Sequence, residues 1–154
     1  MQASSNDGIP AGFELFQLGL GFIDALAPVY IKRGPKSPQV GLKVEAQHSN
    51  LMGICHGGVL MTLLDIGLSA SVRQAAQRDR GSPTISMNTE FISAAKLGDW
   101  VEFTVDSVQP KRLFGFVSGT IRAGGKEIAR GSAVIYLPEK GFAVTKDVGG
   151  AFNH

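Results

Sequence analysis

The chain has 154 residues, of which 44% are hydrophobic and 18% are charged, a composition typical of a globular protein with one core. Its formal net charge of +2 gives no support to a nucleic-acid partner. Glu14 and Asp24 interrupt the only apolar stretch near the start, and no lysine or arginine precedes Lys32, which argues against a membrane helix and a targeting signal. A single cysteine, Cys55, excludes an internal disulfide. We therefore expect one domain over residues 1–154, in the cytoplasm and away from membranes.

The first third of the chain predicts one short helix and two strands. Residues 1–7 are polar, and we expect them to be disordered. Apolar residues at helical spacing predict a helix over about residues 11–26, although two glycines weaken it: Phe13, Phe16, Leu20 and Ile23. Residues 28–33 and 39–47 are predicted strands, separated by the turn-rich segment GPKSP.

The remainder predicts one long helix followed by four strands. From about Gly57 to Arg78 the pattern is helical, and it is apolar nearly all round as far as Val72, so other structure must enclose it. Residues 84–93, 99–109, 113–123 and 126–137 are strand candidates with short connections, which favours an antiparallel meander, and RAGGKE is a hairpin turn. The tail after Pro138 has no clear pattern. The simplest arrangement is an α+β fold, with a curved antiparallel sheet wrapped around one central helix.

The start of the long helix is unusual. His56 occupies the expected cap position, and Gly57 and Gly58 follow it, where Ser, Thr, Asp or Asn would normally cap the free N–H groups. Because no side chain shields the N–H groups of two glycines, they are accessible to a phosphate or to a developing oxyanion. Close packing of the helix end against a strand is the structural alternative.

An acidic residue lies further along the same helix. A carboxylate such as Asp65 is costly to bury unless it is hydrogen-bonded, and partly buried carboxylates often act as bases or nucleophiles. A structural Asp paired with a local donor is the alternative. Gly57 and Asp65 are eight residues apart, or about 12 Å along a helix, too far to act on one carbonyl. Two antiparallel helices related by a two-fold axis would bring them together, so we expect a homodimer at least.

The segment HSNLMGICHGGVLMTLLDIG resembles the motif of hotdog-fold acyl-CoA thioesterases of the phenylacetate-degradation (PaaI-like) type, N-x-x-G-x-x-H-G-G with an acid eight positions after the first glycine of the pair. The resemblance covers about residues 40–137. It implies a hotdog fold, a dimer or tetramer, an acyl-CoA substrate and no further cofactor or metal. It implies that Asp65 activates water or attacks the thioester, and that the Gly57 N–H polarises the carbonyl from the other subunit. Asn50 matches a polar group near that carbonyl, His56 shapes the loop, and Thr84 orients the attacking water.

Several other residues are candidates for substrate binding, catalysis or metal binding. The candidates to line the acyl site are Gly58, Leu51, Met52, Leu60 and Leu64. The candidates to bind the phosphates of coenzyme A are Lys96, Lys111, Arg112 and Arg130. Solvated surface charge is the simpler interpretation of each of these cations. Cys55 beside His56 is a poor nucleophile pair, since adjacent side chains rarely face each other. His48, His56 and His154 lack metal-ligand spacing.

Two other activities remain open. One is a non-catalytic acyl-CoA sensor on the same scaffold, although such regulators usually carry a DNA-binding segment and the first 30 residues contain no basic residue. The other is a hydratase or dehydratase of enoyl thioesters, for which no D-x-N-x-x-H arrangement is present.

Overall fold

A computed structural model describes residues 8–140 of the chain, apart from residues 18, 20 and 80. Its strands form one antiparallel sheet in the order β1-β2-β3-β5-β6-β7-β4. Their bounds are β1 (Glu14–Leu15), β2 (Tyr30–Lys32), β3 (Gln39–Lys43), β4 (Thr84–Phe91), β5 (Trp100–Pro110), β6 (Phe114–Ala123) and β7 (Lys126–Tyr136). The helices are α1 (Phe22–Ala25), α2 (Gly57–Ala75) and the 3-10 turn η1 (Ala46–His48).

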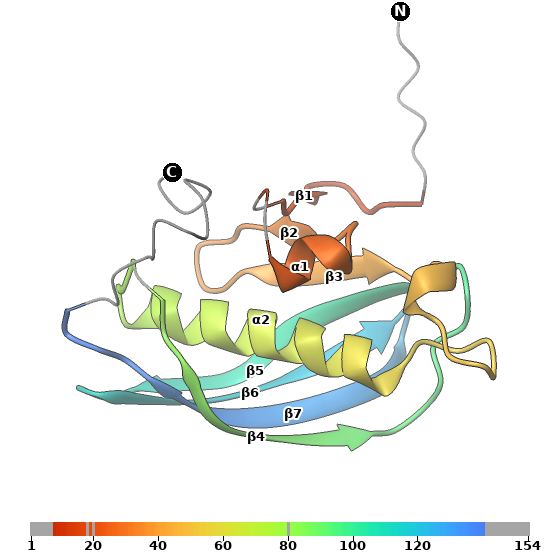
Figure 1. Ribbon diagram of the computed structural model, residues 1–154. Coiled ribbons are helices and arrows are strands. Elements are labelled where there is room, and N and C mark those ends of the chain that lie inside the picture. Colours follow the sequence, from red (N-terminus) through yellow and green to blue (C-terminus); the bar gives the residue numbers. More distant parts are fainter. Residues whose placement is uncertain (1–7, 18, 20, 80, 141–154) are drawn as a thin grey trace, which may run out of the picture.

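The long helix α2 lies along the inner face of the curved sheet. Figure 1 shows α2 between β4–β7 on one side and β2 and β3 on the other. The helix residues that face the sheet are buried: Val59, Leu60, Leu63, Leu64, Gly67, Leu68, Ser71 and Val72. The predicted α+β fold, a curved antiparallel sheet around one central helix, is therefore confirmed.

Phe103 of β5 determines how closely α2 approaches the sheet. Its ring is fully buried between Gly67 of α2 and Gly119 of β6. A Cβ atom added at either glycine would lie 2.2 Å from a ring carbon, which is a direct overlap. These two glycines are thus required by packing, because any side chain would separate the helix from the sheet.

The predicted strands are present, but one of them has a different neighbour from the one expected. β5, β6 and β7 form the antiparallel meander, and Gly124 and Gly125 make the turn between the last two strands. β4 does not join this meander next to β5; it pairs with β7 instead, while β5 pairs with β3. The expectation of four consecutive neighbours was wrong because the chain after β4 continues into the central strand, so that β5 lies between β3 and β6, and β6 and β7 separate it from β4. As a result, β4 becomes an edge strand.

The helix predicted over about residues 11–26 was wrong. The segment contains β1, which pairs with β2, and only the short helix α1. Gly12, Gly19 and Gly21 have positive φ angles, which interrupt any continuous helix. The Phe13 ring instead contacts Trp100 edge-on at 5.0 Å, so tertiary packing determines the path of this segment. Residues 18 and 20 lie outside the described part.

The far end of α2 is shorter than expected. The helix ends at Ala75, not near Arg78, because Gln77 adopts a positive φ of 53° that turns the chain away. The expected disorder of residues 1–7 and the final part of the tail, residues 141–154, fall outside the described residues.

Replacing Gly67 with alanine should destabilise the protein. The new Cβ would overlap the Phe103 ring, and overpacking of this kind costs about 1–3 kcal/mol, more than the gain of about 1 kcal/mol in helix propensity. Urea unfolding should therefore show a lower midpoint for Gly67→Ala. Gly125→Ala is the matched control, since a Cβ there meets nothing within 4 Å, and its midpoint should change little. Equal midpoints for Gly67→Ala and the wild type would contradict this role of Phe103.

Candidate active site

A buried histidine anchors the loop that leads into α2. His48 is fully buried, and its Nδ1 accepts a hydrogen bond from the backbone N–H of Glu45 at 3.0 Å. Its Nε2 lies 2.6 Å from the carbonyl oxygen of Leu26, so the ring carries its proton on Nε2 and donates it there. The backbone carbonyl of His48 accepts from the N–H of His56 at 2.8 Å. His48 therefore fixes the position at which the helix begins.

His56 caps α2 at the expected position, but its ring occupies one of the two glycine N–H groups that were expected to be accessible. His56 is the N-cap residue in an extended conformation, and its Nδ1 accepts a hydrogen bond from the backbone N–H of Gly58 at 2.9 Å. A histidine can do this because its neutral ring presents one nitrogen lone pair, as Asp or Asn presents an oxygen. The N–H of Gly58 is consequently occupied and cannot donate to a substrate. Gly58 can then contribute to binding only by leaving space where a side chain would stand.

Gly57 is left with an available N–H. No acceptor for this group is found among the described residues, and it belongs to the first turn, where N–H groups have no helical partner. Gly57 borders an open pocket of about 240 Å³ next to Phe91, whose ring would lie 3.2 Å from a Cβ at this position. The pocket is lined by Asn50, Ile54, Cys55, Gly57, Leu60, Phe91, Ile92, Ser93, Ala94 and Ala95.

Asn50 lies in the same pocket as Gly57. Its side-chain oxygen accepts hydrogen bonds from the backbone N–H groups of Met52, at 2.9 Å, and Ile54, at 3.4 Å. Its backbone N–H donates to the carbonyl of Ile54 at 2.9 Å, which closes the loop. The amide nitrogen of Asn50 has no partner among the described residues, so it is available as a second donor in a residue that lines the pocket.

Asp65 and Thr84 form the second cluster. The Thr84 hydroxyl donates a hydrogen bond to Oδ1 of Asp65 at 2.6 Å and connects α2 to the first residue of β4. The carboxylate is only partly buried, and none of the ion pairs formed by described residues includes it. Its second oxygen, Oδ2, has no partner within the described part of the chain. A carboxylate held at one oxygen and open at the other can accept a proton from water.

The two clusters lie at opposite ends of one edge strand. Gly57 is beside Phe91, the last residue of β4, whereas Asp65 is bonded to Thr84, the first. The helix and the strand therefore run antiparallel, and Asp65 lies about 12 Å from Gly57 along the helix. Within one protomer, the structure brings Asn50, His56 and Gly57 together, and it brings Asp65 and Thr84 together, but it does not join the two groups.

The apolar residues predicted to line the acyl site differ in position. Leu60 is 4% exposed and lines the pocket next to Gly57, whereas Leu64 is fully buried against Gly131 in the core. Leu51 and Met52 are exposed at the tip of the loop, at 107% and 75%. Leu64 therefore cannot contact a substrate without repacking of the core.

The predicted cations are dispersed. Lys96 is exposed and its backbone pairs with Ile54, so it is near the pocket. Lys111 and Arg112 form the turn before β6, close to the other end of α2, and Arg112 forms an ion pair with Glu139 at 2.8 Å. Arg130 pairs with Glu90 at 2.6 Å. Of these cations, Lys96 alone adjoins the helix start.

Two residues near the site were missed from the sequence. Phe91, 55% exposed, covers Gly57, and Met61, 38% exposed, lies between Gly57 and Asp65 on α2. The signal for Met61 was its spacing, since residues four apart share a helix face. No local signal indicates that the Phe91 side chain contacts the helix start, because β4 is distant from it in sequence.

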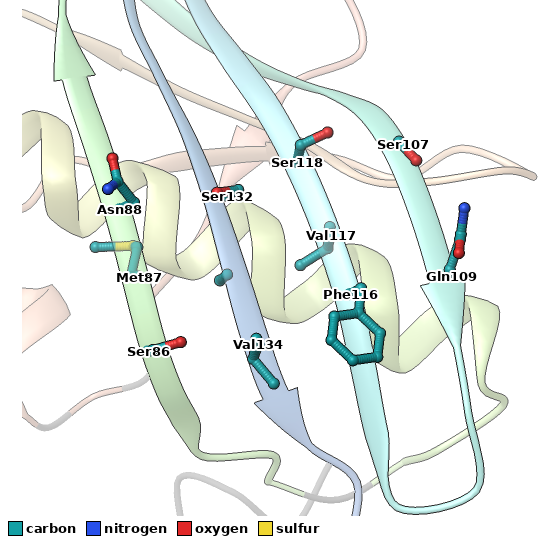
Figure 2. A pocket seen from close by; sticks show the side chains of 11 residues that line it. Ser86, Met87, Asn88, Ser107, Gln109, Phe116, Val117, Ser118, Ser132 and Val134 are labelled. Carbon is teal, nitrogen blue, oxygen red and sulfur yellow. The ribbon is translucent and has the colours of Figure 1, made fainter.

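A second cavity lies on the opposite face of the sheet. It measures about 580 Å³, and Figure 2 shows it over β4–β7 with α2 behind the strands. Its floor is a row of small polar residues paired across the strands: Asn88, Ser132, Ser118 and Ser107. A bulkier row that includes Phe116 borders this floor. None of the predicted site residues lines this groove.

The described residues contain neither a metal-binding cluster nor a membrane-spanning helix. No group of three or more His, Cys, Asp or Glu residues in that part of the chain is arranged to hold a metal ion. No helix in it is long and apolar enough to cross a membrane.

The sequence and the fold were compared with known proteins. Residues 52–129 match the family model described as "Thioesterase superfamily". Acyl-coenzyme A thioesterase 13 of Mus musculus is 33% identical over 111 residues, which cover 70% of this chain and 77% of the mouse protein. Thioesterase superfamily member 2 from zebrafish superimposes with a TM-score of 0.67 at 29% identity, covering 77% of this chain and 87% of that one.

A mutant of the phenylacetic acid degradation protein PaaI from Thermus thermophilus has the same fold, with a TM-score of 0.67 at 20% identity, covering 75% of this chain and 97% of that one. The expected hotdog thioesterase family is therefore confirmed, and the likeness to PaaI is confirmed at the level of the fold. The chain belongs to the thioesterase superfamily: it is a thioester hydrolase with the hotdog fold, an antiparallel sheet wrapped around one long helix.

Proposed function

We propose that the protein hydrolyses the thioester of an acyl- or aryl-CoA to the free acid and coenzyme A. The observation that carries this proposal is the pairing, on one helix, of an available N–H at Gly57 with a carboxylate at Asp65 that is held by Thr84 and has no cationic partner among the described residues. Such a donor and such an acceptor are what water addition to a thioester requires. The relatives named acyl-coenzyme A thioesterase 13 support the substrate class.

The active unit in this proposal is a two-fold dimer formed through β4. One side of β4 pairs with β7, and the described residues provide no strand for its other side. An edge strand of this kind favours pairing with a second chain. Since Gly57 and Asp65 lie near opposite ends of β4, antiparallel pairing with a copy would place Gly57 of each protomer opposite Asp65 of its partner. Exposed apolar side chains on the strand favour such a contact: Ile85 at 60% and Phe91 at 55%.

A tetramer would need a second contact, and the outer groove is the surface we propose for it. The groove is free of charge along its floor, and Phe116, 49% exposed, forms a ridge beside the row of small residues. A ridge next to a groove on the same surface is self-complementary under two-fold symmetry. Two dimers could therefore pack sheet against sheet.

The chemistry follows from the two clusters. The Gly57 N–H and the amide nitrogen of Asn50 donate to the thioester carbonyl and stabilise the charge that develops on its oxygen. Oδ2 of the partner's carboxylate, Asp65, takes a proton from water as the water oxygen bonds to the carbonyl carbon. In the alternative route the carboxylate itself attacks that carbon and forms a mixed anhydride as the thiolate leaves, and water then hydrolyses the anhydride to the free acid and restores the carboxylate. The carbon–sulfur bond then breaks, and the thiolate of coenzyme A leaves and gains a proton.

Thr84 acts as a positioning residue in this scheme. Its hydroxyl proton is committed to Oδ1 of Asp65, so it orients the carboxylate, and its remaining lone pairs can also accept from the attacking water. The role implied by the resemblance, orientation of water, thus extends to orientation of the base.

Asp65→Asn should lower kcat for thioester hydrolysis by at least about a hundredfold with little change in KM, because the base is lost and the shape is kept. Release of free thiol from a panel of acyl- and aryl-CoA substrates measures it. Asp106→Asn is the matched control: Asp106 accepts a hydrogen bond from Thr120 at 2.6 Å, the same distance as in the Asp65 pair, but on the outer face. Thr84→Val should lower kcat, and Thr84→Ser should restore it. Equal turnover of Asp65→Asn and the wild type would remove the proposed role.

Subunit mixing tests the shared site. Gly57→Pro removes the N–H at a helix position that tolerates proline, whereas Gly57→Ala keeps the N–H and adds the same Cβ against Phe91. Gly57→Pro and Asp65→Asn should each be inactive alone. Mixed dimers hold one intact site, so equal co-expression should recover about a quarter of wild-type activity. No recovery, or a monomer mass by light scattering, would contradict the shared site.

Cys55 should not take part in the chemistry. Burial raises the pKa of its thiol from 9.0 to about 11. The thiolate fraction at pH 8 is then about one in a thousand, and a rate that depended on it would rise tenfold per pH unit up to about pH 11. We expect instead a flat kcat between pH 7 and 9, after subtraction of uncatalysed hydrolysis, and slow alkylation by iodoacetamide that becomes fast in urea. A tenfold rise per unit would implicate the thiolate.

A further inference from the structure

One apolar side chain on α2 is exposed although its neighbours are buried. Met61 is 38% exposed, whereas the nearby helix residues Leu60 and Leu64 are 4% and 0% exposed. Gly57, Met61 and Asp65 follow one another at intervals of four residues, so they lie along one face of the helix. Met61 is therefore directed, like the two proposed site groups, away from the protomer's own core.

The symmetry of the proposed dimer places Met61 in a defined position. Residue 61 is the midpoint between 57 and 65, so when each Gly57 faces the partner's Asp65, the two Met61 side chains meet at the axis. Each of the two sites then has the Met61 pair on its axial side. This placement rests on the proposed function, because it requires the shared site.

From the thioester carbonyl, one part of the substrate extends toward the dimer axis, the axial side, and the other extends away from it, the outer side. The residues on these two sides differ in chemistry. On the outer side of Gly57, the pocket is mixed: besides Asn50, which is assigned to the carbonyl, it offers the Ser93 hydroxyl oxygen as an acceptor for the amides of the pantetheine arm, among apolar residues. On the axial side, Met61 is apolar, and so is Met87, which lies mid-strand on β4 and is partly buried against the core. Figure 2 shows the Met87 side chain on the side of β4 away from β7, toward the unpaired edge. The axial side is thus apolar and suits an acyl group.

We propose that Met61 from both protomers forms the wall that separates the two acyl sites and limits the length or bulk of the acyl group accepted. Methionine is unbranched and adaptable, so the wall discriminates by volume and not by hydrogen bonding. Met61 is a specificity residue in this proposal, and it takes no part in proton transfer.

The test compares Met61→Ala and Met61→Phe with the wild type on straight-chain acyl-CoA thioesters and on aryl-CoA thioesters of increasing size. Met61→Ala should move the maximum of kcat/KM to longer chains or larger rings, and Met61→Phe to shorter or smaller ones. The ratio of kcat/KM for a long to a short substrate should change about tenfold or more, since one methylene in an apolar pocket discriminates by that order. Leu15→Ala is the control: Leu15 is 51% exposed on β1, at the opposite edge of the sheet, and its profile should match the wild type.

The outcomes separate this inference from the proposed function. If the wild type hydrolyses no member of the panel, the proposed thioesterase activity fails. If the wild type is active but both Met61 variants keep its profile, the wall proposal is overturned and the activity stands. Loss of the dimer in light scattering, with a uniform fall on all substrates, would also overturn it, since Met61 would then serve association alone.

Discussion

The arrangement of the molecule depends on the close approach of α2 to the sheet at Phe103. The ring occupies the space that side chains at Gly67 and Gly119 would fill, so helix and strands meet at the shortest distance that packing allows. The same helix meets β4 at two other points, where Gly57 lies against Phe91 and Asp65 accepts a hydrogen bond from Thr84.

Two hydrogen bonds of identical length show how location determines the use of a polar pair. Asp106 and Thr120 lie on the outer face, between neighbouring strands of the meander, where the bond joins parts that the sheet already holds together. Asp65 and Thr84 join the helix to an edge strand, and the carboxylate there has no neighbouring cation among the described residues. The second pair therefore combines a structural bond with an oxygen that is open to a reactant.

The division of the site between two ends of β4 links chemistry to assembly in the proposed enzyme. His48 and His56 fix the helix start through their backbone and ring contacts, while Asp65 is fixed more than two turns away by a different element. Each half is held by hydrogen bonds within its own protomer. Hydrolysis would then require no rearrangement within a protomer, only the meeting of two preformed surfaces.

The sequence by itself determined the elements that carry a strong local pattern. Three features were predictable: the apolar helix from Gly57, the strands from Thr84 to Tyr136, and the Gly124–Gly125 turn. Burial of a helix or strand on one or all sides produces a characteristic pattern of apolar residues in the sequence. The predicted association of Thr84 with Asp65 in one site came from the family resemblance, and the structure brings these two residues together.

The tertiary structure alone decided which surfaces these elements meet. The pairing of β4 with β7, the cap that His56 supplies and the contact of Phe91 with Gly57 all join residues whose local patterns say nothing of their partners. The segment around Phe13 has helical spacing, yet it forms β1 because Trp100 and the edge of β2 offer a better contact. Periodicity records that a side chain is buried, but the energy of burial depends on a neighbour that is distant in the chain, and only the folded molecule specifies that neighbour.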